Sequence, residues 1–248
     1  MRLGGICAAI DAPAPRCARR RYNVTMKPEL LTIAIDDAQS VSGLWLEPSR
    51  AKACFVMAHG AGAGMRHAFL ESAASELAAQ GIATLRFQFP YMERGSNRTD
   101  PPKLCHQTVR AAVAEATTRT RLPLFAGGRS FGGRMTSQAQ AASPLENVRG
   151  LAFLGFPLHP AKRPSDERAQ HLFDVQIPML FLQGTRDDLA DLTLLKSLVS
   201  KLGKRATLKL FADADHSFHV PAKTGRKDAE VLSELTTIFA AWIFELIP

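Results

Sequence analysis

The chain has 248 residues, 46% of them hydrophobic and 22% charged, and its formal net charge is +8. This size and balance predict one sizeable globular domain or two small ones, and no apolar run is long enough to cross a bilayer. Five arginines against Asp11 place +4 of the charge in residues 1–25. The rest is spread over the whole domain, so we expect a mildly basic surface and no nucleic-acid partner.

The four cysteines form no C-x-x-C pair. The sequence therefore predicts no disulfide framework and favours a reducing, cytoplasmic compartment. Residues 1–27 differ from the remainder in composition and lack the amphipathic, serine-rich pattern of a transit peptide. We expect a disordered N-terminal extension over residues 1–27 and a single domain over residues 28–248.

Strand-like and helix-like runs alternate along the domain. Two opening strands are separated by a short polar turn, and the next run, "ACFVMAH", is almost continuously apolar, as expected of a strand buried on both faces. Thereafter strands alternate with amphipathic helices. In chain order, the predicted elements are strands Leu31–Ile35, Val41–Leu46 and Ala53–His59, helix Phe69–Ala78, strand Ile82–Phe89, helix Leu104–Ala116, strand Leu122–Ala126, helix Ser130–Ala141, strands Gly150–Phe156 and Ile177–Leu182, helix Asp191–Leu202, strand Thr207–Phe211 and helix Asp228–Leu246.

This order predicts an α/β fold with an eight-stranded, mostly parallel sheet. Repeated strand–helix units require parallel strands with helices on both faces of the sheet. The segment between Phe156 and Ile177 is the longest gap in the second half of the domain. It has room for a loop or a short flap but not for a large lid domain.

Ser130 lies in the glycine-rich stretch "GGRSFGGRM", between a predicted strand and a predicted helix. Gly128 and Gly132 complete a G-x-S-x-G pattern, in which small residues let the backbone pass closely around a strained turn. Such a turn lifts a serine hydroxyl clear of the sheet and beside the amides of the following helix. We expect Ser130 to be a nucleophile, the alternative being a plain glycine turn.

A serine nucleophile needs a base and a carboxylate that orients the base. His216 follows the last predicted strand, and Asp187 lies just after an earlier strand end, so the chain order is Ser, Asp, His. Asp188 is adjacent to the preferred acid, whereas Asp213 and Asp215 are too close in sequence to reach the far nitrogen of the imidazole. His216 and His219 form an H-x-x-H pair without a further ligand cluster, so no metal is expected.

An oxyanion formed at Ser130 needs two amide donors. Phe131, the residue after the nucleophile, is expected to supply one, and Ala61 in "HGAGAG", with Gly62 as its neighbour, the other. The alternative for this early loop is a dinucleotide site. Its third glycine is displaced, because Met65 stands where G-x-G-x-x-G requires glycine, and no acidic residue ends the next strand.

These segments resemble the α/β-hydrolase superfamily over about residues 28–248. More narrowly, "HGAGAGM", "LRFQFPYMERG", "GGRSFGGRM", "GFPLHP", "LFLQGTRD" and "DADHSF" resemble the KANSL-subunit-three/testis-expressed-thirty-like group, near the dienelactone hydrolases. The resemblance implies an eight-stranded, mostly parallel sheet and a Ser–Asp–His triad. Carried over by position, that triad falls on Ser130, Asp187 and His216.

The leading hypothesis is a serine hydrolase that cleaves an ester, thioester or similar acyl bond of a small molecule without a cofactor. Arg129 and Arg86 are candidate contacts for an acidic substrate, and Tyr91 is a candidate for the pocket entrance. The alternative is a catalytically silent binding or scaffold protein with the same fold. The remaining expectations are that the protein has no membrane partner and is a monomer or homodimer.

Overall fold

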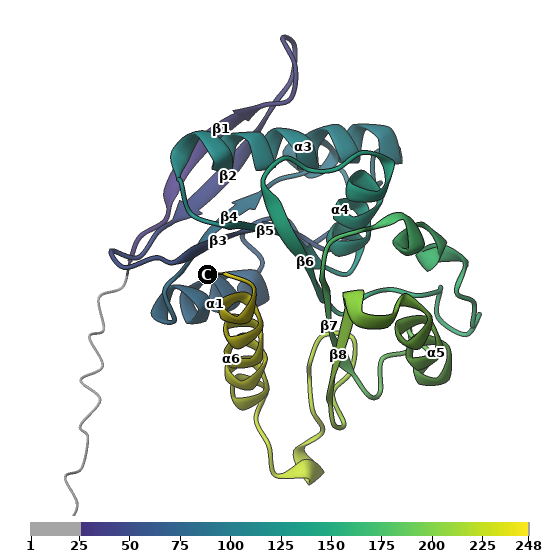
Figure 1. Cartoon of the computed structure of the whole chain (residues 1–248). Helices are drawn as coiled ribbons and strands as arrows, with labels where there is room; N and C mark the ends of the chain where they lie inside the picture. The colour runs from purple at the N-terminus through teal and green to yellow at the C-terminus, as the bar shows by residue number, and fades with distance from the viewer. Residues whose placement is uncertain (1–25, 248) are drawn as a thin grey trace, which may run out of the picture.

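A computed structural model describes residues 26–247, which form one eight-stranded sheet (Figure 1). The strand order is β1-β2-β4-β3-β5-β6-β7-β8. β2 runs antiparallel to both of its neighbours, and the six strands from β4 to β8 are parallel. The strands are β1 Glu29–Ala34, β2 Ser40–Leu46, β3 Ala53–Ala58, β4 Ile82–Phe87, β5 Leu124–Arg129, β6 Val148–Leu154, β7 Met179–Gly184 and β8 Ala206–Phe211. The predicted sheet is confirmed.

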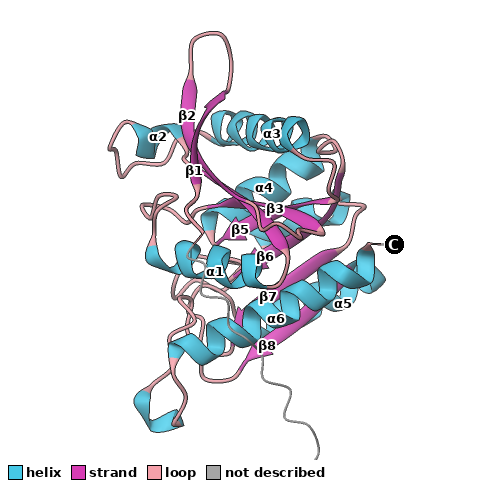
Figure 2. Ribbon diagram, turned by 90° about the vertical axis from the view of Figure 1, so that its left-hand side faces the viewer, coloured by secondary structure: helices cyan, strands magenta, loops and turns pink. Residues whose placement is uncertain are grey.

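Helices cover both faces of the sheet (Figures 1 and 2). α1 and α6 pack together on one face, while α3, α4 and α5 cover the other. The helices are α1 Ala68–Ala79, α2 Pro90–Glu93, α3 Pro102–Arg119, α4 Phe131–Ala142, α5 Leu192–Leu202 and α6 Asp228–Leu246, with short 3₁₀ helices η1 Glu167–Asp174, η2 Gly203–Arg205 and η3 Ala222–Thr224. The predicted extension over residues 1–27 lies outside the described residues apart from Met26 and Lys27, and it stays a prediction.

The sheet separates two hydrophobic cores, one under the helices on each face, and strand β3 contributes side chains to both. Cys54 and Val56 face the core under α3 and α4, whereas Phe55 and Met57 face the core under α1 and α6. Side chains alternate between the faces of a strand, so a strand buried on both faces has no polar positions. This is why β3 appears in the sequence as a continuous apolar run.

Strand β5 is longer at its carboxyl end than the sequence predicted. Gly127 and Gly128 continue the strand and pair with both β3 and β6, where the sequence suggested a loop. Their φ angles of 150° and 143° are rarely adopted by residues with a side chain. The sheet therefore extends directly to the turn that carries Ser130.

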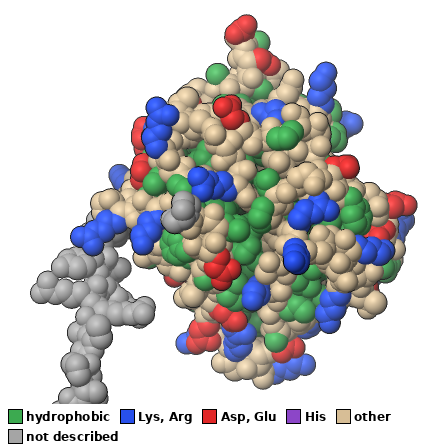
Figure 3. Space-filling model, viewed as in Figure 1, with side chains coloured by type: hydrophobic (Ala, Val, Ile, Leu, Met, Phe, Trp, Pro, Cys, Tyr) green, Lys and Arg blue, Asp and Glu red, His purple; other side chains and the backbone are tan. Residues whose placement is uncertain are grey.

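The segment between β6 and β7 contains only the 3₁₀ helix η1, so the expectation that no large lid domain is present holds within residues 26–247. In the same range, no helix combines the length and apolar character needed to span a membrane. Basic and acidic side chains are interspersed over the face drawn in Figure 3. This face carries no continuous basic stripe.

Candidate active site

Ser130 occupies a strained turn between β5 and α4. Its φ of 50° and ψ of −118° lie outside the regions that residues with side chains favour. A Cβ atom on Gly128 would lie 2.1 Å from the Ala58 carbonyl oxygen, and one on Gly132 would lie 2.5 Å from that of His59. The two glycines of G-x-S-x-G are therefore required by close contact with the end of β3, and not only by the turn.

Ser130, His216 and Asp187 form a continuous hydrogen-bonded chain. The Ser130 Oγ lies 2.8 Å from His216 Nε2, and His216 Nδ1 lies 2.7 Å from Asp187 Oδ2. The three residues come from the turns that follow β5, β8 and β7, at the carboxyl edge of the sheet. Because an ionised carboxylate only accepts hydrogen bonds, Nδ1 carries the imidazole proton and Nε2 is free to accept the serine proton.

The structure distinguishes Asp187 from the other candidate acids. The Asp187 side chain is fully buried and also accepts hydrogen bonds from the Gln183 side-chain amide and, at 2.8 Å, from the Leu189 backbone N–H. Asp188 is exposed, and Asp213 is exposed at a turn with a φ of 59°. Three donors to one buried carboxylate fix its orientation toward His216.

Asp215 has a local structural role beside His216. Its carboxylate accepts hydrogen bonds from the backbone N–H groups of Ser217, at 2.7 Å, and His219, at 3.0 Å. The second histidine of the H-x-x-H pair points to another partner, Asp228, at 2.9 Å. Over residues 26–247 no group of three or more metal-ligating side chains is arranged to hold a metal ion.

Two of the three predicted oxyanion donors, the amides of Phe131 and Ala61, donate to no acceptor within residues 26–247. Phe131 is the first residue of α4, where the amides lack an intrahelical partner, and the amide of Ala61 lies in the exposed loop after β3. The Gly62 amide, in contrast, donates to the Tyr91 hydroxyl at 3.2 Å. Phe131 and Ala61 therefore remain candidates, whereas Gly62 is occupied in this structure.

An open cavity of about 430 Å³ lies over the serine. It brings together the serine, its histidine and the loop after β3, while the carboxylate lies buried behind the histidine. The lining residues are Gly60, Ala61, Gly62, Ala63, His67, Arg129, Ser130, Leu189 and His216. No carboxylate side chain is among them.

The three predicted substrate contacts differ in position. Arg129 lines the cavity, but Arg86 is only 2% exposed and donates to the Met65 carbonyl oxygen at 3.2 Å. Tyr91 is also buried and supports the loop after β3 from behind. The positions of Arg86 on β4 and Tyr91 in α2 thus do not support the predicted contacts, because both side chains are buried and neither lines the cavity.

His59 is a residue beside the site that the sequence analysis did not single out. It is buried, its Nδ1 donates to the Gly60 carbonyl at 2.7 Å, and its Nε2 accepts from the Phe89 N–H at 3.0 Å. Burial lowers the pKa of His59 to about 4, so the ring is neutral and keeps one tautomer. The ring thereby fixes the loop after β3. Its only sequence signal was a histidine that ends an otherwise apolar strand.

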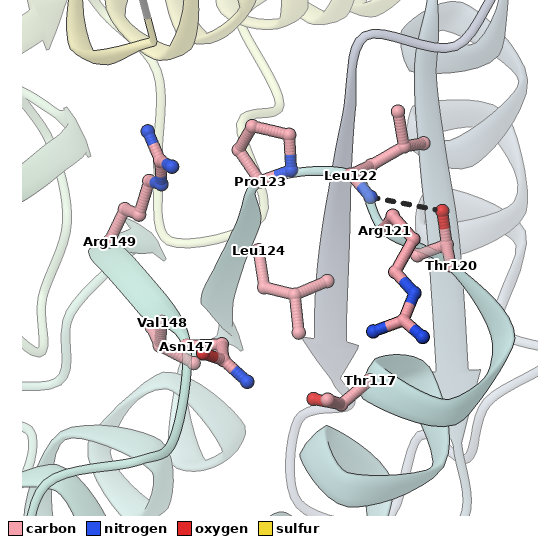
Figure 4. Close-up of a pocket in the computed structure, with 9 residues that line it drawn as sticks. All are labelled: Thr117, Thr120, Arg121, Leu122, Pro123, Leu124, Asn147, Val148 and Arg149. Atoms are coloured by element: carbon pink, nitrogen blue, oxygen red, sulfur yellow. Dashed lines mark hydrogen bonds between the residues drawn. The ribbon is translucent and has the colours of Figure 1, made fainter.

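A second cavity of about 400 Å³ lies at the amino ends of β5 and β6 (Figure 4). It is formed by the last turn of α3, the segment Thr120–Leu124 and the start of β6. Ligands of parallel sheets gather at the carboxyl ends of strands, which is the opposite edge. This cavity contains none of the predicted site residues.

The sheet order and the strained serine turn at its carboxyl edge define an α/β-hydrolase fold. The chain belongs to the family described as "Alpha/beta hydrolase domain", whose model matches residues 51–244. The match does not confirm the narrower KANSL-subunit-three/testis-expressed-thirty-like group, which stays a prediction.

Solved structures show the same fold at low sequence identity. A dienelactone hydrolase from Anabaena variabilis is 20% identical with a TM-score of 0.72, over 90% of this chain and 99% of that one. XC6422 from Xanthomonas campestris, described as an α/β serine hydrolase without a lid, is 22% identical with a TM-score of 0.68, over 87% and 95%. Est1E from Butyrivibrio proteoclasticus is 14% identical with a TM-score of 0.66, over 88% and 98%.

Proposed function

We propose that this protein is a serine hydrolase that cleaves an ester, thioester or similar acyl bond through an acyl-enzyme intermediate. The observation that carries the proposal is the hydrogen-bonded chain from Ser130 through His216 to Asp187, with distances of 2.8 and 2.7 Å. A glycine turn without chemistry would not need a buried carboxylate behind a histidine. The strained backbone of Ser130 is also typical of functional positions.

In the first half of the proposed reaction, Ser130 Oγ attacks the carbonyl carbon of the substrate. His216 Nε2 accepts the hydroxyl proton, and the carbonyl π electrons move to the oxygen, giving a tetrahedral oxyanion. The amides of Phe131 and Ala61 are the proposed donors to that oxyanion. When the carbon–oxygen or carbon–sulfur bond breaks, His216 returns its proton to the leaving alcohol or thiol.

In the second half, water attacks the acyl group on Ser130. His216 Nε2 takes a proton from the water, and the collapse of the second tetrahedral intermediate releases the acid while Ser130 Oγ recovers its proton. Asp187 stays ionised throughout. It holds the imidazole in the tautomer with Nδ1 protonated and stabilises the imidazolium that each step forms.

The size and openness of the site favour small substrates. The cavity of about 430 Å³ over Ser130 has the volume of a small-molecule site, and the segment between β6 and β7 does not form a large lid. Structures of similar fold include proteins named as a dienelactone hydrolase and as esterases. These names support an acyl substrate for this chain.

Activity-based labelling tests the proposal. A fluorophosphonate probe is expected to label the wild-type protein at Ser130, and a short para-nitrophenyl ester is expected to be hydrolysed. Ser130→Ala should abolish both. Ser143→Ala, at the exposed opposite end of α4, is the matched control and should label normally. A folded wild-type protein that neither labels nor turns over a short ester would contradict the proposal and favour the scaffold alternative.

A further inference from the structure

Arg129 is the charged side chain closest in sequence to the proposed nucleophile, and it lies along the cavity. Its Cγ would be 4.0 Å from a Cβ on Gly60, so the stem runs beside the loop after β3. The guanidinium carbon lies 5.0 Å from the Phe69 ring centroid, and Nη2 donates to Ser217 Oγ at 2.8 Å. Stacking and one hydrogen bond therefore hold the group between α1 and the His216 loop.

The partners of this guanidinium are neutral. Within residues 26–247, Ser217 is its only hydrogen-bond acceptor and no carboxylate lies within ion-pair distance. Asp215 is close enough to raise the pKa of Arg129, but its carboxylate bonds to two backbone amides. Burial lowers the pKa of Arg129 and outweighs that effect, so the environment does not compensate this cation fully.

His67 adds a second donor to the same cavity. Its Nδ1 accepts a hydrogen bond from the Phe69 N–H at 3.2 Å, which places the proton of the neutral ring on Nε2. Partial burial and the Arg129 charge both lower the pKa of His67, so the ring is neutral at physiological pH. The cavity lining therefore includes two side chains with N–H donors and no carboxylate.

We infer that the protein selects acyl substrates that carry a second, ionised acid group, which Arg129 binds with help from His67. The inference rests on the proposed hydrolase function and names its substrate class. A guanidinium offers several N–H groups in a planar fork that matches a carboxylate, and most of those of Arg129 are unused. Stacking on Phe69 fixes the fork before the substrate arrives, which reduces the entropy lost on binding.

The test compares charged esters with neutral esters of the same shape. Mono-para-nitrophenyl succinate is paired with para-nitrophenyl levulinate, which places the charge on the acyl side. Para-acetoxybenzoate is paired with para-acetoxyacetophenone, which places it on the leaving group. We expect kcat/KM of the wild-type protein, corrected for spontaneous hydrolysis, to be at least about tenfold higher for the charged member of one pair.

Substitution of Arg129 should remove this preference specifically. Arg129→Gln is expected to lower kcat/KM more for the charged ester than for the neutral one, which brings the charged-to-neutral ratio close to one. Arg186→Gln removes an exposed charge from the loop that carries Asp187 and lies outside the cavity lining, so it should keep the ratio. If Arg129→Gln does not fold, Arg129→Lys keeps the charge but loses the planar fork and should lower the ratio severalfold.

The outcomes separate this inference from the proposed function. A wild-type ratio near one in both pairs, a preference that survives Arg129→Gln, or an equal loss for charged and neutral esters would overturn the role of Arg129 while leaving the hydrolase intact. Calorimetric binding of mono-para-nitrophenyl succinate to Ser130→Ala gives a readout independent of turnover. We expect binding there, and its loss when Arg129→Gln is added. Equal binding by both variants would also overturn the inference.

Discussion

Replacing Gly128 by alanine tests whether the end of β3 determines the shape of the serine turn. The added Cβ would lie 2.1 Å from the Ala58 carbonyl oxygen and 2.7 Å from its nitrogen. Both atoms belong to the backbone of a strand that is paired on either side, so neither can move aside cheaply. Gly128 must instead shift away from β3 and carry Ser130 with it.

The expected loss of stability has two sources. Overpacking of a rigid core costs about 1–3 kcal/mol, and holding an alanine at a φ of 143° adds roughly 1–3 kcal/mol. Together these give about 2–6 kcal/mol, which lowers Tm on the order of 10 °C for a domain of this size. Gly225→Ala separates the two sources, because Gly225 has a φ of 69° but no atom within 4 Å of a Cβ. It should cost only about 1–2 kcal/mol.

Differential scanning calorimetry of the two variants measures the difference, and fluorophosphonate labelling reports on the turn itself. We expect Gly128→Ala to melt well below Gly225→Ala and to label far more slowly than the wild type at a temperature where it is still folded. Equal melting temperatures for the two variants would show that β3 yields to the new Cβ. That result would refute the steric explanation of the G-x-S-x-G spacing.

Three further predictions follow from individual contacts. Asp187→Asn should lower kcat/KM for a short ester by about 10⁴-fold. An asparagine amide cannot accept all three hydrogen bonds that Asp187 accepts, and it favours the His216 tautomer with the proton on Nε2. A loss below tenfold would contradict the proposed role of Asp187 in orienting His216. Tyr91→Phe should lower kcat/KM by about fivefold, because the Gly62 amide loses the acceptor that positions its loop. Tm should change little, since the exposed amide can bind water instead. Unchanged kinetics would show that this contact does not position the loop. The pKa of His59 is about 4 in the folded protein and 6.5 in the unfolded chain. As pH falls, the imidazole of His59 is therefore protonated first in the unfolded state, which stabilises that state. The free energy of unfolding in urea should therefore drop by up to about 3 kcal/mol between pH 6.5 and 4, and His59→Gln should flatten this dependence; parallel profiles for both proteins would refute the assignment.

The sequence predicted the sheet and the relative placement of three candidate residues because both follow from local rules. A strand buried on both faces must be apolar throughout, and a serine on a strand-to-helix turn requires small neighbours two residues away on either side. Ser130, Asp187 and His216 each follow a predicted strand, so parallel topology brings them to one edge of the sheet. Their distances in the structure agree with that reasoning, while their catalytic roles remain the proposal.

The direction and burial of other side chains could not be obtained in this way. Arg86 lies on a strand near the expected edge, and an arginine is usually exposed. In the structure every residue of β4 is buried, and the loop around Met65 accepts a hydrogen bond from this arginine. Tyr91 follows the same strand, but its role depends on contact with Gly62, 29 residues earlier in the chain. Such burial depends on tertiary packing, which no periodic pattern in the sequence records.

The contacts of His59 and Tyr91 connect the loop after β3 with the turn between β5 and α4. The Phe131 ring lies 5.5 Å from Phe89 and 6.3 Å from Tyr91, and His59 packs 4.9 Å from Phe89. Because Tyr91 also binds the Gly62 amide, one aromatic cluster contacts both loops that carry the proposed oxyanion donors. Donors that are fixed before charge develops need no reorganisation during the reaction. The aromatic cluster, buried except for the partly exposed Phe131, thus supports both loops of a site that is open to solvent.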